Sequence, residues 1–151
     1  MSIPSLFRHV LQAGDPNFTE GLRPQFVIVY GQEANCLEVY TMTEIEKLEA
    51  KIEKLPSSGL KRKLVRRFTS LSHHTEVDPD GRLVLPQRLR ERIGLEKEAV
   101  FVGTSGTFQI WSPAEYEAHL DEEDDDLGFD IPEGTDPLDA LDMVLAAKGI
   151  E

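Results

Sequence analysis

The chain of 151 residues is 40% hydrophobic and 29% charged, a mixture typical of a folded globular protein with room for one ordinary domain or two very small ones. Its apolar runs are far too short to cross the roughly 30 Å of hydrocarbon in a bilayer, and its first residues lack the pattern of a secretory signal. The single cysteine excludes an internal disulfide and a zinc site made of several cysteines. We therefore expect a cytoplasmic protein that does not enter the membrane.

The formal net charge of −12 is unevenly distributed along the chain. From Glu115 onward, 14 acidic residues face one basic residue, so this segment carries −13 and residues 1–114 carry +1. Within that body, residues 61–92 hold nine basic and four acidic residues. Because a polyanion responds to the field at the contact surface, this basic patch is compatible with nucleic-acid binding. The alternative interpretation is a solvated helix face with scattered surface arginines.

Two parts of the chain resemble each other and predict an internal duplication. The aligned pairs are 3–10 with 85–92 (offset 82), 27–31 with 99–103 (offset 72) and 36–40 with 107–111 (offset 71). The offset falls because the first copy carries an insertion rich in polar residues, glycine and proline, which we predict to be a surface loop over 14–25. Each copy is predicted to form strand, short helix, strand, turn, strand and short helix.

The second copy predicts a β-hairpin with a tight turn at its tip. Short segments at 75–77 and 83–85 flank the turn sequence 78–81, in which a proline fixes φ and a glycine can adopt a left-handed conformation. A short helix is predicted to follow from Pro86 and to end at Gly94.

A further hairpin and a final helix complete this copy. Strands are predicted at 99–102 and 108–111 around a turn at 103–106, and Ser112 is predicted to cap the last helix. A unit of about forty residues leaves strand edges and half a core exposed, so each copy is expected to be stable only when paired with the other. Projected onto the first copy, the turn sequence falls before Met1, so the first half of the given sequence lacks its hairpin tip: either the start is truncated or misassigned, or this protein has lost one tip.

Two helices are predicted between the copies. Thr43 and Glu46 form the pattern of a capping box, and apolar residues follow at helical spacing up to a break at 56–59. The second helix carries an apolar stripe that faces away from most of its basic residues. The stripe consists of Leu60, Leu64, Phe68 and Leu71.

The last part of the chain is predicted to be an acidic, partly disordered tail. Six consecutive carboxylates at 121–126 repel one another, and they lack the spacing of a calcium loop. After a proline and a glycine, a short helix is predicted to begin at Asp136, with Leu138 and Leu141 on its apolar face.

These motifs together resemble the MraZ family, transcriptional regulators of the division and cell-wall gene cluster in bacteria. The resemblance runs from about Ser2 to Leu120. It rests on the turn Asp78-Pro79-Asp80-Gly81-Arg82, on the following Leu83-Val84-Leu85-Pro86 with Leu89-Arg90, and on the closing Phe108-Gln109-Ile110-Trp111.

The resemblance implies an α+β fold of tandem AbrB-like β-barrel halves with short helices, in which two halves of one chain act like two chains of a swapped-hairpin dimer. It also implies a ring-forming homo-oligomer that binds short direct repeats in double-stranded DNA of a promoter, and hence a nucleoid-associated protein. The implied organisation is a first half at 1–55, a connecting helix at 56–72, a second half at 73–120 and the tail at 121–151.

Within the tip, Arg82 is the first candidate for DNA contact. The glycine at position 81 lets the backbone approach closely, and the guanidinium presents a planar set of five donors to phosphate or guanine. Asp78 is expected to hold the turn, because a carboxylate beside phosphates is repulsive. The alternative is a plain turn with a solvated arginine.

Three arginines at 88, 90 and 92 follow on the predicted short helix. Because they are two residues apart, they cannot all face one way. We expect one of them to pair internally, and Arg88 and Arg90 are the further candidates for DNA contact.

The histidines at 73 and 74 and the cysteine at 36 do not indicate a metal site or a catalytic nucleophile. His73 and His74 are adjacent on a strand, so they point to opposite faces and are poorly placed to hold one metal; we predict them at the surface. Cys36 falls on an alternating strand and is predicted to be a small core residue. The chain contains no phosphate loop, no zinc-protease motif and no nucleophile with a convincing base. We therefore predict no enzyme, no cofactor, no metal and no small-molecule substrate.

One other function stays open at this point. AbrB-type DNA-binding bodies also occur with acidic tails that wrap a toxin, so an antitoxin-like protein whose tail inhibits a protein partner is the alternative. The duplication favours the regulator, whereas purification with a tight endogenous partner would favour the antitoxin.

Overall fold

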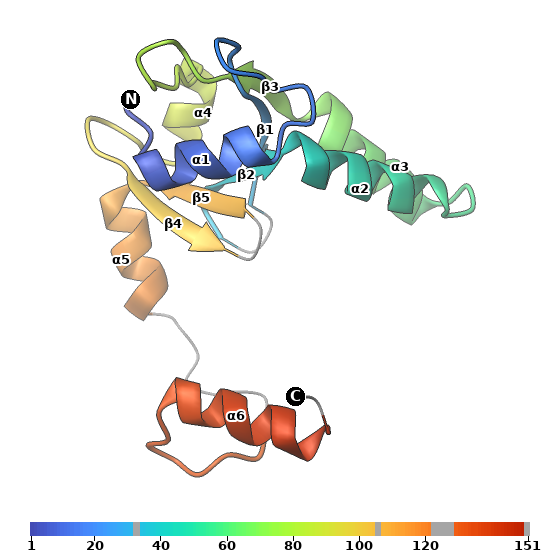
Figure 1. The fold of residues 1–151 in the computed structure, drawn as a ribbon, viewed down its shortest axis with the longest axis vertical. Helices are drawn as coiled ribbons and strands as arrows, with labels where there is room; N and C mark the ends of the chain where they lie inside the picture. The colour runs from blue at the N-terminus through green and yellow to red at the C-terminus, as the bar shows by residue number, and fades with distance from the viewer. Residues whose placement is uncertain (32–33, 105–106, 122–128, 150–151) are drawn as a thin grey trace. The chain divides into compact units, whose positions relative to one another are not determined.

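One antiparallel sheet is the centre around which the first part of the chain is folded (Figure 1). The computed structural model describes residues 1–31, 34–104, 107–121 and 129–149. The chain forms two units, Met1–His119 and Leu120–Glu151. In the described part of the first unit the sheet has the order β3-β1-β2-β5-β4. Its strands are β1 (Gln25–Tyr30), β2 (Leu37–Thr41), β3 (His73–Glu76), β4 (Val100–Thr104) and β5 (Thr107–Trp111), with a continuous apolar run in β1 and alternating apolar residues in β2 and β5.

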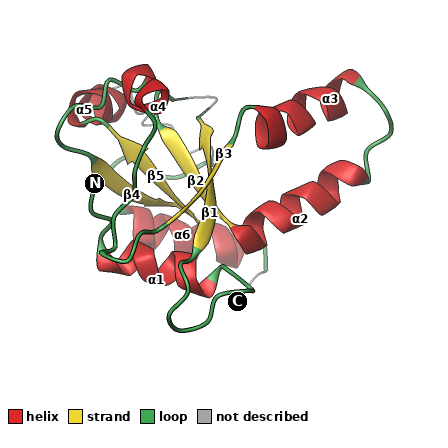
Figure 2. Ribbon diagram, turned by 90° about the horizontal axis from the view of Figure 1, so that it is seen from above, coloured by secondary structure: helices red, strands yellow, loops and turns green. Residues whose placement is uncertain are grey.

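Helices cover both faces of this sheet. They are α1 (Ser5–Ala13), α2 (Met42–Glu53), α3 (Gly59–Val65) continuing as the π-helix η1 (Arg66–Ser70), α4 (Gln87–Arg92) and α5 (Pro113–Asp121). Helices α2, α3 and α5 start at a side-chain cap, whereas α1 and α4 each start after a proline. The hydroxyl of Ser58 caps α3, and that of Ser112 accepts from the backbone N–H of Glu115, so the predicted cap at Ser112 is confirmed. Helices α2 and α3 form a hairpin that projects from the sheet (Figures 1 and 2).

The predicted capping box at Thr43 is wrong by two residues. Thr41 caps α2, since its Oγ1 accepts a hydrogen bond of 3.2 Å from the backbone N–H of Glu44. The hydroxyl of Thr43 instead donates to the carbonyl of Gly14 at 2.9 Å. The reason is that β2 runs directly into α2 at Thr41, so the last residue of the strand serves as the cap.

The internal duplication is visible in the register of the central strand pair. Leu37 lies opposite Ile110, and Val39 lies opposite Phe108. With the offset of 71, exchanging the two copies maps each of these pairs onto the other. The copies are therefore related by a pseudo-two-fold axis that passes between Glu38 of β2 and its partner in β5.

The predicted alignment of the preceding strands is wrong by one residue. Val27 of β1 lies opposite Tyr40, and Val100 of β4 lies opposite Trp111. Because Tyr40 and Trp111 correspond, Val27 corresponds to Val100, which is an offset of 73 and not 72. A slip of one residue moves every side chain to the other face of the strand. Two apolar runs of similar composition do not specify this register, whereas pairing with the neighbouring strand does.

The two arms of the predicted hairpin at 75–77 and 83–85 do not pair with each other as a ladder. The first arm forms β3, which pairs with β1 and places Thr75 opposite Phe26. The second arm lies beside the N-terminus, where the N–H of Leu83 donates to the carbonyl of Met1 at 2.7 Å and Ser2 pairs with Arg82. Both arms of the second copy thus pair with the first copy, and β3 of the second copy covers the sheet edge at β1 of the first.

Two apolar clusters hold the sheet and helices of the first unit together. One face buries strand residues of both copies, including Phe26, Val39 and Phe108, against Leu11 of α1 and Leu89 of α4. The other face is covered by α2 and η1; its buried residues are Val27, Val29, Ile45, Ile52 and Phe68. The first cluster takes six buried residues from the first copy and eight from the second, so neither copy contains it complete.

The insertion of the first copy forms the predicted loop, over residues 14–24 between α1 and β1. Its polar anchor is the buried carboxylate of Asp15, which accepts hydrogen bonds of 3.0 Å from the backbone N–H groups of Asn17 and Gln25. These bonds fix the two ends of the loop relative to each other.

The second unit contains the predicted tail helix, α6 (Pro137–Ala147). Asp136 caps it through a 2.8 Å hydrogen bond from the N–H of Leu138. Residues 122–128, which include most of the predicted carboxylate run, and the predicted turn residues 105 and 106 lie outside the described residues. Among the helices that the structure describes, none is long and apolar enough to cross a membrane.

The second arm, residues 83–85, lies beside the N-terminus and buries every other side chain. We therefore expect its buried residues to contribute to stability and its exposed residue not to. Leu83 is 1% exposed and its neighbour Val84 is 75% exposed. Leu83→Ala is expected to lower the free energy of unfolding by about 2 to 5 kcal/mol, whereas Val84→Ala should change it by less than about 0.5 kcal/mol. Urea unfolding followed by circular dichroism measures both. Equal effects of the two substitutions would contradict this packing.

Candidate nucleic-acid interface

The tip at residues 78–82 is a tight turn that one side chain holds in shape. Asp78 Oδ1 accepts hydrogen bonds from the backbone N–H groups of Asp80 at 2.9 Å and Arg82 at 2.7 Å. The backbone closes the turn, since Asp78 N–H donates to the Arg82 carbonyl at 2.9 Å and Gly81 N–H donates to the Asp78 carbonyl at 3.0 Å. The predicted turn-holding role of Asp78 is therefore confirmed.

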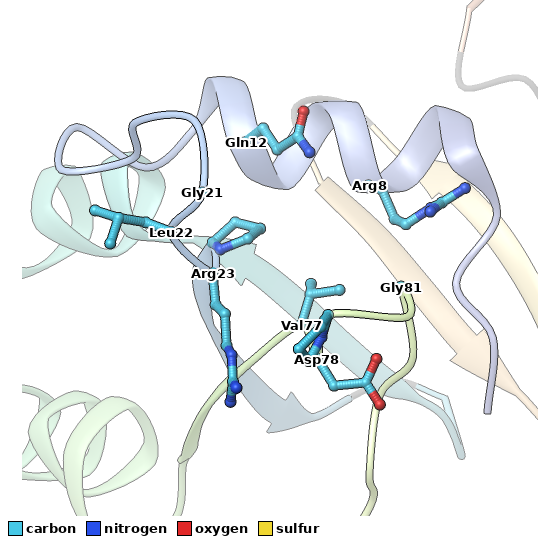
Figure 3. A pocket seen from close by; sticks show the side chains of 10 residues that line it. Arg8, Gln12, Gly21, Leu22, Arg23, Val77, Asp78 and Gly81 are labelled. Atoms are coloured by element: carbon cyan, nitrogen blue, oxygen red, sulfur yellow. The ribbon is translucent and has the colours of Figure 1, made fainter.

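Gly81 is required in this turn on two counts. Its φ is +74°, in the left-handed region that favours glycine. A Cβ atom at this position would also lie 2.5 Å from Nη1 of Arg8 and 3.0 Å from its Cδ. Arg8 comes from α1 of the first copy and lies against the tip of the second (Figure 3). The glycine thus allows the close approach between the two copies as well as the turn itself.

The guanidinium of Arg82 is available for a ligand. The side chain is exposed, and among the described residues it takes part in none of the ion pairs, which join Arg23 to Glu76, Lys47 to Glu44, Lys61 to Glu53 and Arg67 to Glu38. Its backbone is fixed by the Asp78 carboxylate, so the turn presents the side chain from a defined position.

The three arginines of the following helix have different surroundings. Arg88 and Arg90 are exposed on α4. Arg92 places its guanidinium carbon 4.2 Å from the centre of the Tyr30 ring, a cation–π contact. One of the three is thus engaged internally, as predicted, through an aromatic ring and not through a carboxylate. None of them is among the residues that line a cleft of about 410 Å³ beside the tip.

A cleft of about 410 Å³ lies between the tip and the first copy (Figure 3). The tip contributes Val77, Asp78, Pro79 and Gly81, and the first copy contributes Arg8 and Gln12 of α1 with Gly21, Leu22, Arg23 and Pro24 of the loop. Sequence analysis missed Arg8, Gln12 and Arg23 as site residues. The alignment of Arg8 with Arg90 at the offset of 82 could have pointed to Arg8 as a site residue. Its nearness to the tip, however, follows from the pairing between the two copies.

The other polar residues of the second copy stay outside this cleft. On β3, His74 is exposed and His73 is half-buried; burial, and then the charge of Arg88, lower the pKa of His73. Cys36 lies one residue before β2 and is buried, as predicted for a core residue. Burial, with a further contribution from Glu38, raises the pKa of the Cys36 thiol to about 11, so the thiol is protonated and unreactive at neutral pH.

The fold and the tip define an α+β protein with one antiparallel sheet, in which a strand of the second copy joins the sheet at the first copy and is followed by a glycine-arginine turn. A family model described as "MraZ protein, putative antitoxin-like" matches residues 70–133. The protein named transcriptional regulator MraZ of Ruegeria pomeroyi is 46% identical over 144 residues, which cover 94% of this chain and 86% of that protein. Its namesake from a second Ruegeria species is 47% identical with the same coverage, and that of Cereibacter sphaeroides is 41% identical over 150 residues, or 94% and 87% of the two chains.

The chain therefore belongs to the MraZ family of transcriptional regulators. This membership confirms the resemblance that the sequence showed at residues 78–82, at residues 83–90 and at residues 108–111. It also confirms the prediction that the protein is not an enzyme, because the relatives are named as regulators of transcription.

Two glycines with positive φ allow the contact between Arg8 and the tip to be measured. Alanine in the left-handed region costs about 1 to 2 kcal/mol, and Gly94, with φ +67° and no atom within 4 Å of an added Cβ, should show this cost alone. Gly81→Ala should lower the free energy of unfolding further, because the new methyl group also displaces Arg8.

Urea unfolding of the two variants gives this comparison. Combining Gly81→Ala with Arg8→Ala should reduce its effect to that of Gly94→Ala. If Gly81→Ala lowers the free energy of unfolding as much in the Arg8→Ala background as in the wild type, contact with Arg8 is not the cause of the additional loss.

Proposed function

We propose that this protein is a sequence-specific DNA-binding regulator of the division and cell-wall gene cluster, which binds direct repeats in a promoter as a ring oligomer. The observation that supports it most is the exposed Arg82 guanidinium on a turn held by Asp78 and bent at Gly81. A narrow turn can enter a groove that a globular face cannot, and a guanidinium matches guanine or phosphate with two parallel hydrogen bonds.

Local charge supports the same proposal. The carboxylate of Asp78 accepts two backbone N–H groups, which reduces its repulsion of phosphate. Arg88 and Arg90 are exposed on α4 and serve in this proposal as secondary contacts to the DNA backbone. The net negative charge is carried by residues 115–151, whereas residues 1–114, which include the tip, carry +1.

The pairing of β3 with β1 supports the AbrB-like part of the proposal. In a swapped-hairpin dimer each partner completes the sheet of the other, and here β3 of the second copy completes the sheet at β1 of the first. The proposed halves are residues 1–55 and 73–120, joined by a helical connection at 56–72 and followed by the tail. Such a protein acts in the cytoplasm, at the nucleoid.

The projecting α2–α3 hairpin supports the ring. Leu60 is 58% exposed, Leu71 50% and Val65 38%. Apolar residues of this size on a protruding element fit a contact with another copy, and a contact between two different surfaces closes into a ring when the rotation allows. A ring multiplies weak tip contacts on repeated sites, because each further tip binds at a high effective concentration.

The antitoxin-like function remains the second candidate, on one observation from the tail. Helix α6 has Leu138 72% exposed, Leu141 51% and Met143 45%, and it alternates these residues with Asp139 and Asp142. An acidic helix with an apolar face fits a protein partner. Purification of the full chain with a stoichiometric, tightly bound protein would favour this function over the regulator.

Replacement of Arg82 tests the proposed DNA contact. Arg82→Ala should weaken binding to a duplex from the chain's own promoter by about 1 to 3 kcal/mol and reduce discrimination against a scrambled duplex, with the melting temperature unchanged. Arg62→Ala, which removes an exposed arginine from α3, is the control and should retain the discrimination. Fluorescence anisotropy measures both affinities. An unchanged affinity and discrimination for Arg82→Ala would refute the proposal for this residue.

The proposed ring is tested by the native mass. Light scattering after gel filtration should give a fixed multiple of the monomer mass at about 10 μM, and replacing Leu60 and Val65 together by glutamate should reduce it, since two buried charges cost several kcal/mol per interface. Leu22→Glu on the loop at 14–24 is a control with an equally exposed leucine. A monomeric wild-type protein would refute the ring, and a full-sized Leu60/Val65 variant would refute this interface.

A further inference from the structure

Two arginines from the first copy flank the tip of the second. Arg8 of α1 and Arg23 of the loop both line the cleft of about 410 Å³, to which the tip contributes Asp78 (Figure 3). Neither belongs to the basic patch at 61–92 that the sequence predicted. They are the two cations among the residues that line the cleft, and Asp78 is the one anion.

Arg8 lacks a counter-ion within the described residues. Its side chain is half-buried, its Nε is buried without a hydrogen-bond partner, and none of the ion pairs includes it. A cation that is partly removed from water and left unpaired is unfavourable. An anion bound in the adjacent cleft would supply the missing partner.

Arg23 has donors to spare. Its Nη1 donates to Glu76 at 3.0 Å, and both side chains are largely exposed, 52% and 44%. A guanidinium has five N–H donors, so one ion pair leaves most of them for a ligand. The loop that carries Arg23 belongs to the first copy alone, since α4 is followed by only residues 93–99 before β4.

The charges around Arg23 define the side on which an anion can bind. A second cleft, of about 390 Å³, lies on the other side of this residue and is lined by Asp15, Glu46 and Glu76. Three carboxylates repel an anion there. The cleft at the tip is lined by one carboxylate, that of Asp78, which accepts two backbone N–H groups.

We propose that the cleft beside the tip binds a phosphate group of the DNA backbone, with Arg23 as its exposed ligand and Arg8 as its half-buried ligand. This inference rests on the proposed function and extends it from one arginine on the tip to a site built by both copies. Arg82 then reads the groove, while the cleft fixes the position of the turn on the backbone.

The salt dependence of binding tests the proposal on the full chain. For a promoter duplex titrated between 50 and 200 mM KCl, Arg23→Gln should lower the affinity about three- to tenfold and reduce the slope of log affinity against log salt by about one per bound chain. The loss should be equal for a scrambled duplex, because a phosphate contact carries no sequence information. Glu76→Gln, which frees Arg23 from its ion pair, should leave the affinity unchanged or increase it.

Two further measurements separate the alternatives. Lys54→Gln, a control that removes an exposed cation from the end of α2, should leave the slope of a promoter duplex closer to wild type than Arg23→Gln does. Arg8→Gln should reduce the slope as Arg23→Gln does, and it should not lower the melting temperature, because the lost side chain is an unpaired cation.

Titration with inorganic phosphate identifies the source of the ligand. A rise in the melting temperature of the wild type, absent in Arg23→Gln, together with an unchanged slope for DNA, would show a site for free phosphate and overturn the DNA-backbone assignment. An unchanged slope with no response to phosphate would overturn the site altogether. If the wild type binds no duplex even at low salt, the proposed function fails, and the phosphate titration alone then decides on the cleft.

Discussion

The pairing of β3 with β1 is the contact on which the rest of the structure depends. Without it, each copy would leave strand edges and half of an apolar cluster in water, which a unit of about forty residues cannot sustain. The pairing takes the first arm of the hairpin away from the second arm, and the second arm then lies along the N-terminus. The turn between the two arms is consequently held at both ends by the first copy.

This anchoring explains why the tip has neighbours from a distant part of the chain. Helix α1 and the loop that follows it precede β1, so they lie where the second copy's arms meet the sheet. Arg8 approaches Gly81 so closely that a methyl group would displace it. The candidate site therefore depends on both copies: the turn comes from the second copy, and Arg8 and Arg23 come from the first.

Local patterns predicted the elements of the fold well, because they depend on neighbours in sequence. The strands β1 and β5, the helix breaks at 56–59 and Gly94, and the cap at Ser112 all follow from side chains within a few residues. The hairpin ladder at 75–77 and 83–85 was wrong, and the offset of 72 missed by one residue, because strand partners are chosen by burial of the whole sheet. For the same reason the turn itself was predictable from the sequence, whereas the approach of Arg8 and Arg23 to it was not.

The basic patch of the sequence differs from the cations available in space. Among the nine basic residues at 61–92, three already have a partner within the chain: Lys61 pairs with Glu53, Arg67 pairs with Glu38 and Arg92 stacks on Tyr30. The tip gains Arg8 and Arg23 from outside the patch. Each phosphate neutralised contributes about 0.9 to the salt slope, so under the proposed function a tip with so few free cations would bind DNA weakly by itself. The proposed ring would offset this weakness by bringing several tips to one duplex, and the repeat of the DNA site would then have to match the spacing of the tips.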